Sequence, residues 1–360
     1  MRTDGDGPMT EGSGRTVRVA SDIARLTEFL RSSQWTDGLP VVPPTVELVA
    51  EMVAASRRPG SDVVTPVPPS FADATIELIA ANAVLAGCRP SAMPILMAAL
   101  EAMMDPAFNL SGIQATTHPC GILLLVSGPA AARADIYGGE GCFGPGFTGN
   151  LTIGRAIRLV LMNIGGARPG TTDRSCQATP AKLGICFTEN VSASPWAPFH
   201  VDQGWRAADS VVTVLAAEGP HNIQDHASTT AEGLLDTVAG AMRNVGANNF
   251  VMSLGAHRAS SPGNWRPRPL VVFGPEHAQT IAGAGFDREG VRRLLWERSR
   301  VPFSQIPIDW RHDLNGTEEI PMTPEPEDIL IAVAGGVGKH SCWMPSMGST
   351  SMASQKIVEV

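Results

Sequence analysis

A short pattern of apolar and turn residues occurs twice in this chain, and it limits the folds that the chain can adopt. Asp62-Val-Val-Thr65 resembles Ser210-Val-Val-Thr213, and Val126-Ser-Gly-Pro129 resembles Val272-Phe-Gly-Pro275 at almost the same separation. Each copy predicts a strand, an amphipathic helix, a second strand, a Gly-Pro turn and a further helix. Two copies would give an α/β fold, in which internally duplicated strand-helix-strand-helix units form one pseudo-symmetric domain. The alternative is that strand–Gly-Pro–helix, a common local pattern, recurs here by chance.

The two copies and the segments around them predict the organisation of the whole chain. We expect a disordered tail over residues 1–18, then N-terminal helices and an extended Pro-rich arm over 19–60. The first α/β repeat would cover 61–205 and the second 206–325. Residues 326–360 would add a C-terminal strand and a glycine turn.

Local patterns place several elements within this plan. Trp35-Thr-Asp-Gly-Leu-Pro-Val-Val-Pro-Pro-Thr45 cannot be a helix or a central strand, because its prolines lack the N–H donor. Thr45 is placed to cap a following helix, and residues 150–163 are nearly all apolar, as in a buried helix. The continuous apolar run 122–126 predicts a strand that is buried on both faces, and 329–334 predicts another strand.

Composition excludes several classes of protein. The chain has 360 residues and a net charge of −8, without a basic stripe, which argues against nucleic-acid binding. No apolar run approaches the ~18 residues that would cross a membrane, and the polar first residues do not resemble a signal peptide. Six cysteines without a CxxC motif indicate reduced thiols and a cytoplasmic protein. Charged residues make up only 17% of the chain, which suggests that part of its surface is buried in a homo-oligomer.

The clearest candidates for chemistry begin with Thr116-Thr-His-Pro-Cys-Gly121, just before the buried strand. His118 and Cys120 are close enough to share a site, and a neighbouring histidine can lower the pKa of a thiol and make it a nucleophile. The alternative is a structural thiol beside a loop histidine.

A glycine-dense turn precedes the helix that starts near Asn150, and it is a candidate for binding an anion. Gly144 and Gly146 leave the backbone accessible, and Arg155 lies one turn into the helix. The spacing does not match the dinucleotide fingerprint. Glu189 and Asn190 lie in another polar loop and could orient a substrate or cap a turn.

Two further loops carry polar groups. Glu218-Gly-Pro-His-Asn-Ile-Gln-Asp-His226 offers Glu218, His221 and His226 as metal ligands or as an acid–base set. The pattern is not that of a zincin, and Asp225 could instead be a helix cap. Near the C-terminus, Gly335-Gly-Val-Gly-Lys-His-Ser-Cys342 departs from a P-loop at two positions but would place Lys339 and His340 at a strand end.

Several longer motifs resemble one family of bacterial proteins of largely unassigned function. They are W-T-D-G-L-P-V-V-P-P-T at 35–45, T-T-H-P at 116–119, A-E-G-P-H-N at 217–222 and G-K-H-S at 338–341. Members of this family are often associated with small (seleno)proteins that carry a Sec/Cys-Gly-Ser-Cys motif. The resemblance implies thiol or redox chemistry with a small redox partner protein, and it favours the histidines and Lys339 over Cys120 and Cys342 as obligatory groups.

Together these features predict an enzyme that acts on a small anionic molecule, with His118, Cys120, His221, Lys339 and His340 as catalytic groups. The first hypothesis is thiol-linked oxidoreductase chemistry. The second is a hydratase, lyase or hydrolase assisted by a divalent metal; beyond this option the sequence leaves the cofactor unknown. The third is a non-catalytic subunit of a multi-protein complex.

Overall fold

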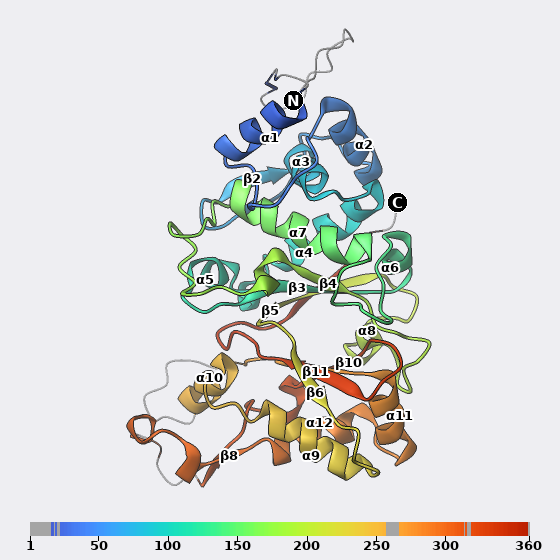
Figure 1. Cartoon of the computed structure of the whole chain (residues 1–360), viewed down its shortest axis with the longest axis vertical. Helices are drawn as coiled ribbons and strands as arrows, with labels where there is room; N and C mark the ends of the chain where they lie inside the picture. Colours follow the sequence, from blue (N-terminus) through green and yellow to red (C-terminus); the bar gives the residue numbers. More distant parts are fainter. Residues whose placement is uncertain are drawn as a thin grey trace.

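The chain folds into four layers, in which two β-sheets lie face to face between two layers of helices (Figure 1). The computed structural model describes residues 16, 17, 19, 22–256, 266–312, 314 and 318–358. The α/β class predicted from the sequence is confirmed. The tail predicted over residues 1–18 lies almost wholly outside the described residues.

The first sheet has the strand order β12-β5-β3-β4. Its strands are β3 (Gly121–Ser127), β4 (Ile185–Phe187), β5 (Val211–Ala217) and β12 (Ala353–Lys356). β3 pairs with β4 in parallel and with β5 antiparallel, and every residue of β3 is buried, as its apolar run predicted. Alternate side chains of β3 point to opposite faces: Leu123 and Leu125 contact the second sheet, whereas Leu124 contacts the helices.

The second sheet has the strand order β10-β7-β11-β6 and repeats the arrangement of the first. Its strands are β6 (His221–Gln224), β7 (Leu270–Phe273), β10 (Leu330–Val333) and β11 (His340–Met344). β7 pairs with β10 in parallel and with β11 antiparallel, so β7 holds the position that β3 holds in the first sheet. A Gly-Pro pair follows each of these strands and begins a helix, α6 (Pro129–Arg133) or α11 (Pro275–Gly283). This match supports the predicted duplication, which stays a prediction.

The predicted equivalence of the two Val-Val-Thr segments is wrong. β1 (Val63–Val67) forms a two-stranded hairpin with β2 (Ala72–Thr75), whereas the matching Val-Val-Thr segment is the start of β5, inside a four-stranded sheet. β-Branched residues fit any half-buried strand, so three of them do not identify equivalent strands. The chain also exchanges strands between the sheets, because β5 leads into β6 of the second sheet and β11 leads back into β12 of the first.

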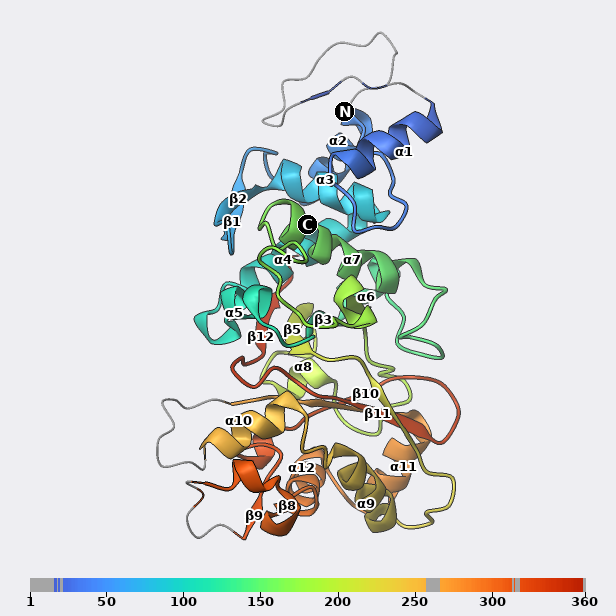
Figure 2. The same ribbon diagram turned by 60° about the vertical axis from the view of Figure 1, so that its left-hand side comes forward.

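Helices cover the outer face of each sheet (Figure 2). On the side of the first sheet, α4 (Met93–Ala102), α6 and α7 (Thr148–Asn163) contact the strands, whereas α2 (Val46–Ser56) and α3 (Ile76–Ala86) pack on α4 and α7. The other helices on this side are α5 (Leu110–Ala115) and α1 (Ile23–Ser32), and α1 lies at the outer end in Figure 1. The helices over the second sheet are α9 (Ala231–Met242), α10 (Asn248–Ala256), α11 and α12 (Arg288–Arg298). The remaining α-helix is the short α8 (Phe199–Asp202), and the remaining two strands are the pair β8 (Val301–Pro302) and β9 (Glu319–Ile320). Among the described residues, no helix combines the length and the apolar character that a membrane span requires.

The Pro-rich arm contains neither helix nor strand between residues 35 and 44 and is held against α7. Arg155 on α7 donates to both carboxylate oxygens of Asp37, at 2.7 and 2.8 Å, and to the carbonyl of Pro40 at 2.9 Å. Thr45 then caps α2, where its hydroxyl accepts the N–H of Leu48, as the sequence predicted.

Candidate functional site

Two loops and a strand end meet where β3 begins. The loop 116–120 leads into β3, and the loop 168–183 lies against it, with the N–H of Cys176 bound to the carbonyl of Thr117 at 3.1 Å. The hydroxyl of Ser175 also donates to the carbonyl of His118 at 3.2 Å. Glu218 follows the last residue of β5, which pairs with the first residue of β3. The antiparallel pairing therefore brings Glu218 beside the loop 116–120.

His118 and Glu218 form a hydrogen-bonded pair at this point. Nε2 of His118 lies 2.8 Å from Oε1 of Glu218, and the two side chains are 11% and 29% exposed. A carboxylate only accepts hydrogen bonds, so Nε2 carries the hydrogen and Nδ1 keeps a lone pair. Nδ1 is buried and has no hydrogen-bond partner. This arrangement holds an imidazole in one tautomer with a nitrogen ready to take a proton.

A buried ion cluster lies beside this pair. Both oxygens of Asp173 accept from Nζ of Lys182 at 2.7 Å, and one also accepts from Nη2 of Arg158 at 3.0 Å. The side chains of Arg158 and Lys182 are 11% exposed, and that of Asp173 is 4% exposed. Burial by itself raises the pKa of Asp173, but its bonds to Lys182 and Ser175 hold that pKa below its usual value. Asp173 therefore stays ionised.

Two glycines explain why α7 can place Arg158 here. A Cβ on Gly154 would lie 2.9 Å from the carbonyl carbon of Gly184, and a Cβ on Gly184 would be closer still to Gly154. α7 therefore lies directly on the backbone that enters β4. Arg158, one turn further along α7, then reaches the start of the first sheet.

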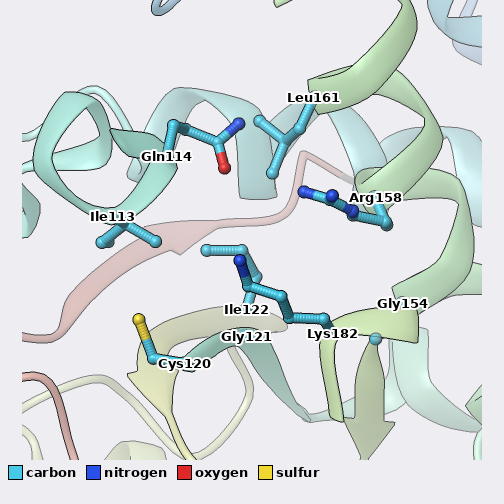
Figure 3. Close-up of a pocket in the computed structure, with 10 residues that line it drawn as sticks. Ile113, Gln114, Cys120, Gly121, Ile122, Gly154, Arg158, Leu161 and Lys182 are labelled. Atoms are coloured by element: carbon cyan, nitrogen blue, oxygen red, sulfur yellow. The ribbon is translucent and has the colours of Figure 1, made fainter. Parts of the chain in front are cut away.

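Arg158 and Lys182 of this cluster line a pocket of about 290 Å³, counting the space open to solvent (Figure 3). Figure 3 shows the side chains of Gln114, Arg158 and Lys182 directed toward one space, with Ile122 and Leu161 among its apolar walls. Gln114 is only 3% exposed, and its amide nitrogen is buried without a hydrogen-bond partner. The pocket thus combines two cations, a buried amide donor and an apolar wall.

Cys120 also lines this pocket, where its surroundings disfavour the thiolate that the predicted reactive thiol would need. Its side chain is 0% exposed and lies 3.7 Å from the sulfur of Met347. Burial raises the pKa of the Cys120 thiol to about 12, although Lys182 acts in the opposite direction. The neighbouring histidine does not lower this pKa because it binds Glu218 instead. Burial likewise raises the pKa of Cys342 to about 12.

The residues predicted to bind an anion after the glycine turn have structural partners. Asn150 accepts the N–H of Tyr137 and donates to the carbonyls of Tyr137 and Cys142, which closes the turn. Arg155 binds the Pro-rich arm. Gly144 and Gly146 lie in the turn itself, where Gly146 has a φ of +130°.

Glu189 and Asn190 join the two sheets. Glu189 is 2% exposed and pairs with Arg288 at 3.0 Å, and it accepts the N–H of Val333 at 3.1 Å. Burial raises the pKa of Glu189 despite this pairing. Asn190 donates two hydrogen bonds at the end of β10. Its backbone N–H binds the carbonyl of Val333, and its side-chain amide binds the carbonyl of Gly335. Their polar groups therefore fix β4 to β10.

The remaining predicted residues lie on β6 and β11, in the second sheet. His221 pairs with Trp343 and His340 with Gln224, so the two histidines lie at opposite ends of this strand pair. At about 3.4 Å per residue, that is roughly 10 Å along the strands. His340 is exposed, lies 3.0 Å from Asn222 and contacts the ring of His226 at 5.4 Å.

The predicted metal set of Glu218, His221 and His226 is not assembled. Glu218 binds His118, and His226 lies beyond the far end of β6 from His221. Within the described ranges, no three His, Cys, Asp or Glu side chains are gathered to hold a metal ion. Lys339, at the far end of the pair from His221, accepts a hydrogen bond from the N–H of Asp225 through its carbonyl at 3.4 Å.

Sequence reasoning did not identify Gln114, Asp173 and Lys182 as site residues. Arg158 carried a signal, because it and Arg155 are the only charged residues on the nearly apolar helix α7. No local pattern distinguishes Asp173 or Lys182, since their role arises only where the loop 168–183 folds back onto the sheet.

No protein-family model, curated protein or solved structure matches this chain. Its fold and site define it as an α/β protein of four layers with a histidine–carboxylate pair next to a cationic pocket. The resemblance in its motifs stays a prediction.

Proposed function

We propose that this protein is an enzyme that transfers a proton to or from a small anionic molecule, as lyases and hydratases do. In this proposal His118 is the general base, Glu218 orients it, and the pocket beside β3 binds the substrate. One observation carries the proposal: Nε2 of His118 is bound to Glu218 at 2.8 Å, while Nδ1 of the same ring has no hydrogen-bond partner.

The proposed step follows from the hydrogen-bond roles of the pair. Nδ1 of His118 takes a proton from the substrate, which keeps the electron pair of the broken bond. The imidazolium that forms donates from Nε2 to Glu218, whose negative charge stabilises it. Arg158 and Lys182 then offset the negative charge that grows on the substrate.

Thiol-linked oxidoreductase chemistry is less well supported. It needs a thiolate, and burial raises the pKa of both Cys120 and Cys342 to about 12. The histidine–carboxylate pair works without a thiol, and the part of the chain that the structure describes gathers no three His, Cys, Asp or Glu side chains for a metal. Proton transfer by side chains alone therefore has the stronger support.

Exchange of substrate C–H for deuterium tests the proposal. The protein is incubated in D₂O with a panel of small carboxylic acids, and loss of each C–H signal is followed by ¹H NMR. His118→Gln should slow exchange by about 100-fold or more, the usual contribution of a general base. The matched control is His312→Gln, because His312 is exposed on the other half of the molecule.

A wild-type protein that exchanges no acid in the panel would count against proton transfer at carbon. Unchanged exchange in His118→Gln would remove His118 from the mechanism. Glu218→Gln should give a smaller loss than His118→Gln, because the amide can still hold the ring but carries no charge.

A further inference from the structure

We propose that the ligand of the β3 pocket is a small monocarboxylate with a short apolar chain, whose carboxylate binds Arg158 and Gln114. The assignment deepens the proposed function, on which it rests for the identity of the site. It is argued from the charge, the donors and the walls of the pocket.

The net charge of the pocket matches one carboxylate. Arg158 and Lys182 contribute two positive charges, and Asp173, which binds both, contributes one negative charge. All three side chains are at least 89% buried, so little solvent screens the positive charge that remains. Within these three residues one positive charge remains for an anionic group, while the nearby carboxylate of Glu218 is bound to His118.

The donors of the pocket also suit a carboxylate. Lys182 directs its ammonium to Asp173 and Ser175, so it supplies charge more than hydrogen bonds. Arg158 uses Nη2 on Asp173, and its planar fork has further N–H groups that can bind a carboxylate. The guanidinium points into the pocket in Figure 3.

Gln114 supplies the second independent observation. Its amide nitrogen is buried and has no hydrogen-bond partner within the protein, which is unfavourable for a polar group. Figure 3 shows this amide facing the same space as Arg158. A ligand oxygen placed between the two would satisfy the amide donor and the guanidinium together.

The walls limit the rest of the ligand. Ile113, Ile122 and Leu161 line the pocket with aliphatic carbon. Its volume of about 290 Å³ includes space open to solvent, so the enclosed space is much smaller than a typical ligand site and admits only a very small ligand. An acid of a few carbons would bury its chain against these side chains, whereas a second charged group would find an apolar wall.

A titration followed by ¹H–¹⁵N NMR tests the assignment with propionate as the probe. Propionate should bind the wild-type protein with a dissociation constant on the order of 1 mM, as a ligand this small permits. Propionamide, which has the same shape without the charge, should bind at least about tenfold more weakly. Succinate should also bind more weakly than propionate, because its second carboxylate meets the aliphatic wall.

Two variants locate the site. Gln114→Leu replaces the amide with an apolar group of similar size and should weaken propionate binding about tenfold, while the melting temperature stays the same or rises. Arg158→Gln should weaken it more, and Gln305→Leu, at an exposed position, should leave it unchanged. Full propionate affinity in Gln114→Leu, or equal binding of propionamide, would overturn the assignment, as would a lack of propionate binding to the wild type.

His118→Gln separates this inference from the proposed function. That variant should keep propionate binding and lose deuterium exchange. If the wild type binds propionate at Gln114 but exchanges no acid, only the proton-transfer proposal fails.

Discussion

Replacing Cys120 by alanine distinguishes thiol chemistry from proton transfer more directly than any other single change. Burial raises the pKa of this thiol from 9.0 to about 12. At pH 7 an ordinary thiol with a pKa of 9.0 is about 1% thiolate, whereas one with a pKa of about 12 is roughly a thousandfold less ionised. Cys120 in the folded protein should therefore be almost unreactive toward alkylating reagents.

The assay is alkylation by iodoacetamide at pH 7, with each cysteine followed by peptide mass spectrometry. Cys176 is exposed and should react first, whereas Cys120 should react at about a thousandth of the rate of an ordinary thiol, or more slowly. In denaturant the two cysteines should react alike, which serves as the control for reagent access.

The Cys120→Ala variant should keep deuterium exchange close to the wild-type rate. Its free energy of unfolding should fall by about 1 kcal/mol, because the side chain is fully buried against Met347 and its removal leaves a small cavity. A variant that keeps its melting temperature but loses all activity would refute the reasoning, and so would rapid alkylation of Cys120 in the native protein.

Two further changes test buried ion pairs that hold the fold together, one at the Pro-rich arm and one between the two sheets. Asp37→Asn should lower the free energy of unfolding by about 3 kcal/mol in urea titrations, because it leaves Arg155 without its carboxylate partner. Burial raises the pKa of Asp37 but its bonds to Arg155 hold it below 3.8, so the contribution is present above pH 3.8 and is lost as the pH falls through the lowered pKa; a stability difference that grows as the pH is lowered below 3.8 would contradict this. Arg288→Met should lower the free energy of unfolding by about 3–5 kcal/mol, because Glu189 is left buried without its cation, and Arg288→Met with Glu189→Leu should recover part of that loss. If the double variant is no more stable than the single one, the loss comes from packing and not from the unpaired charge.

The local sequence predicted much of the secondary structure. The apolar run 122–126 lies in β3, residues 150–163 lie in α7, and 329–334 contains β10. The Gly-Pro pairs mark helix starts after β3 and β7. These predictions rest on periodicity and on the limits that glycine and proline place on the backbone, which act within a few residues.

The pairing of strands could not be predicted in this way. The Val-Val-Thr match failed because its residues describe any half-buried strand and say nothing about partners. The sequence also did not predict β12, the last strand of the chain, which follows β11 and pairs with β5. Strand order depends on contacts between residues far apart in the chain, and no local pattern records them.

The candidate site, too, was indicated only in part by the sequence. The sequence by itself singled out His118 and Glu218, as polar groups next to strand ends. Only the tertiary structure joined them, because the antiparallel register of β3 and β5 brings the two strand ends together. The same burial that forms the pocket raises the pKa of Cys120, so the environment that disfavours its thiolate also comes from the tertiary structure and not from the local sequence.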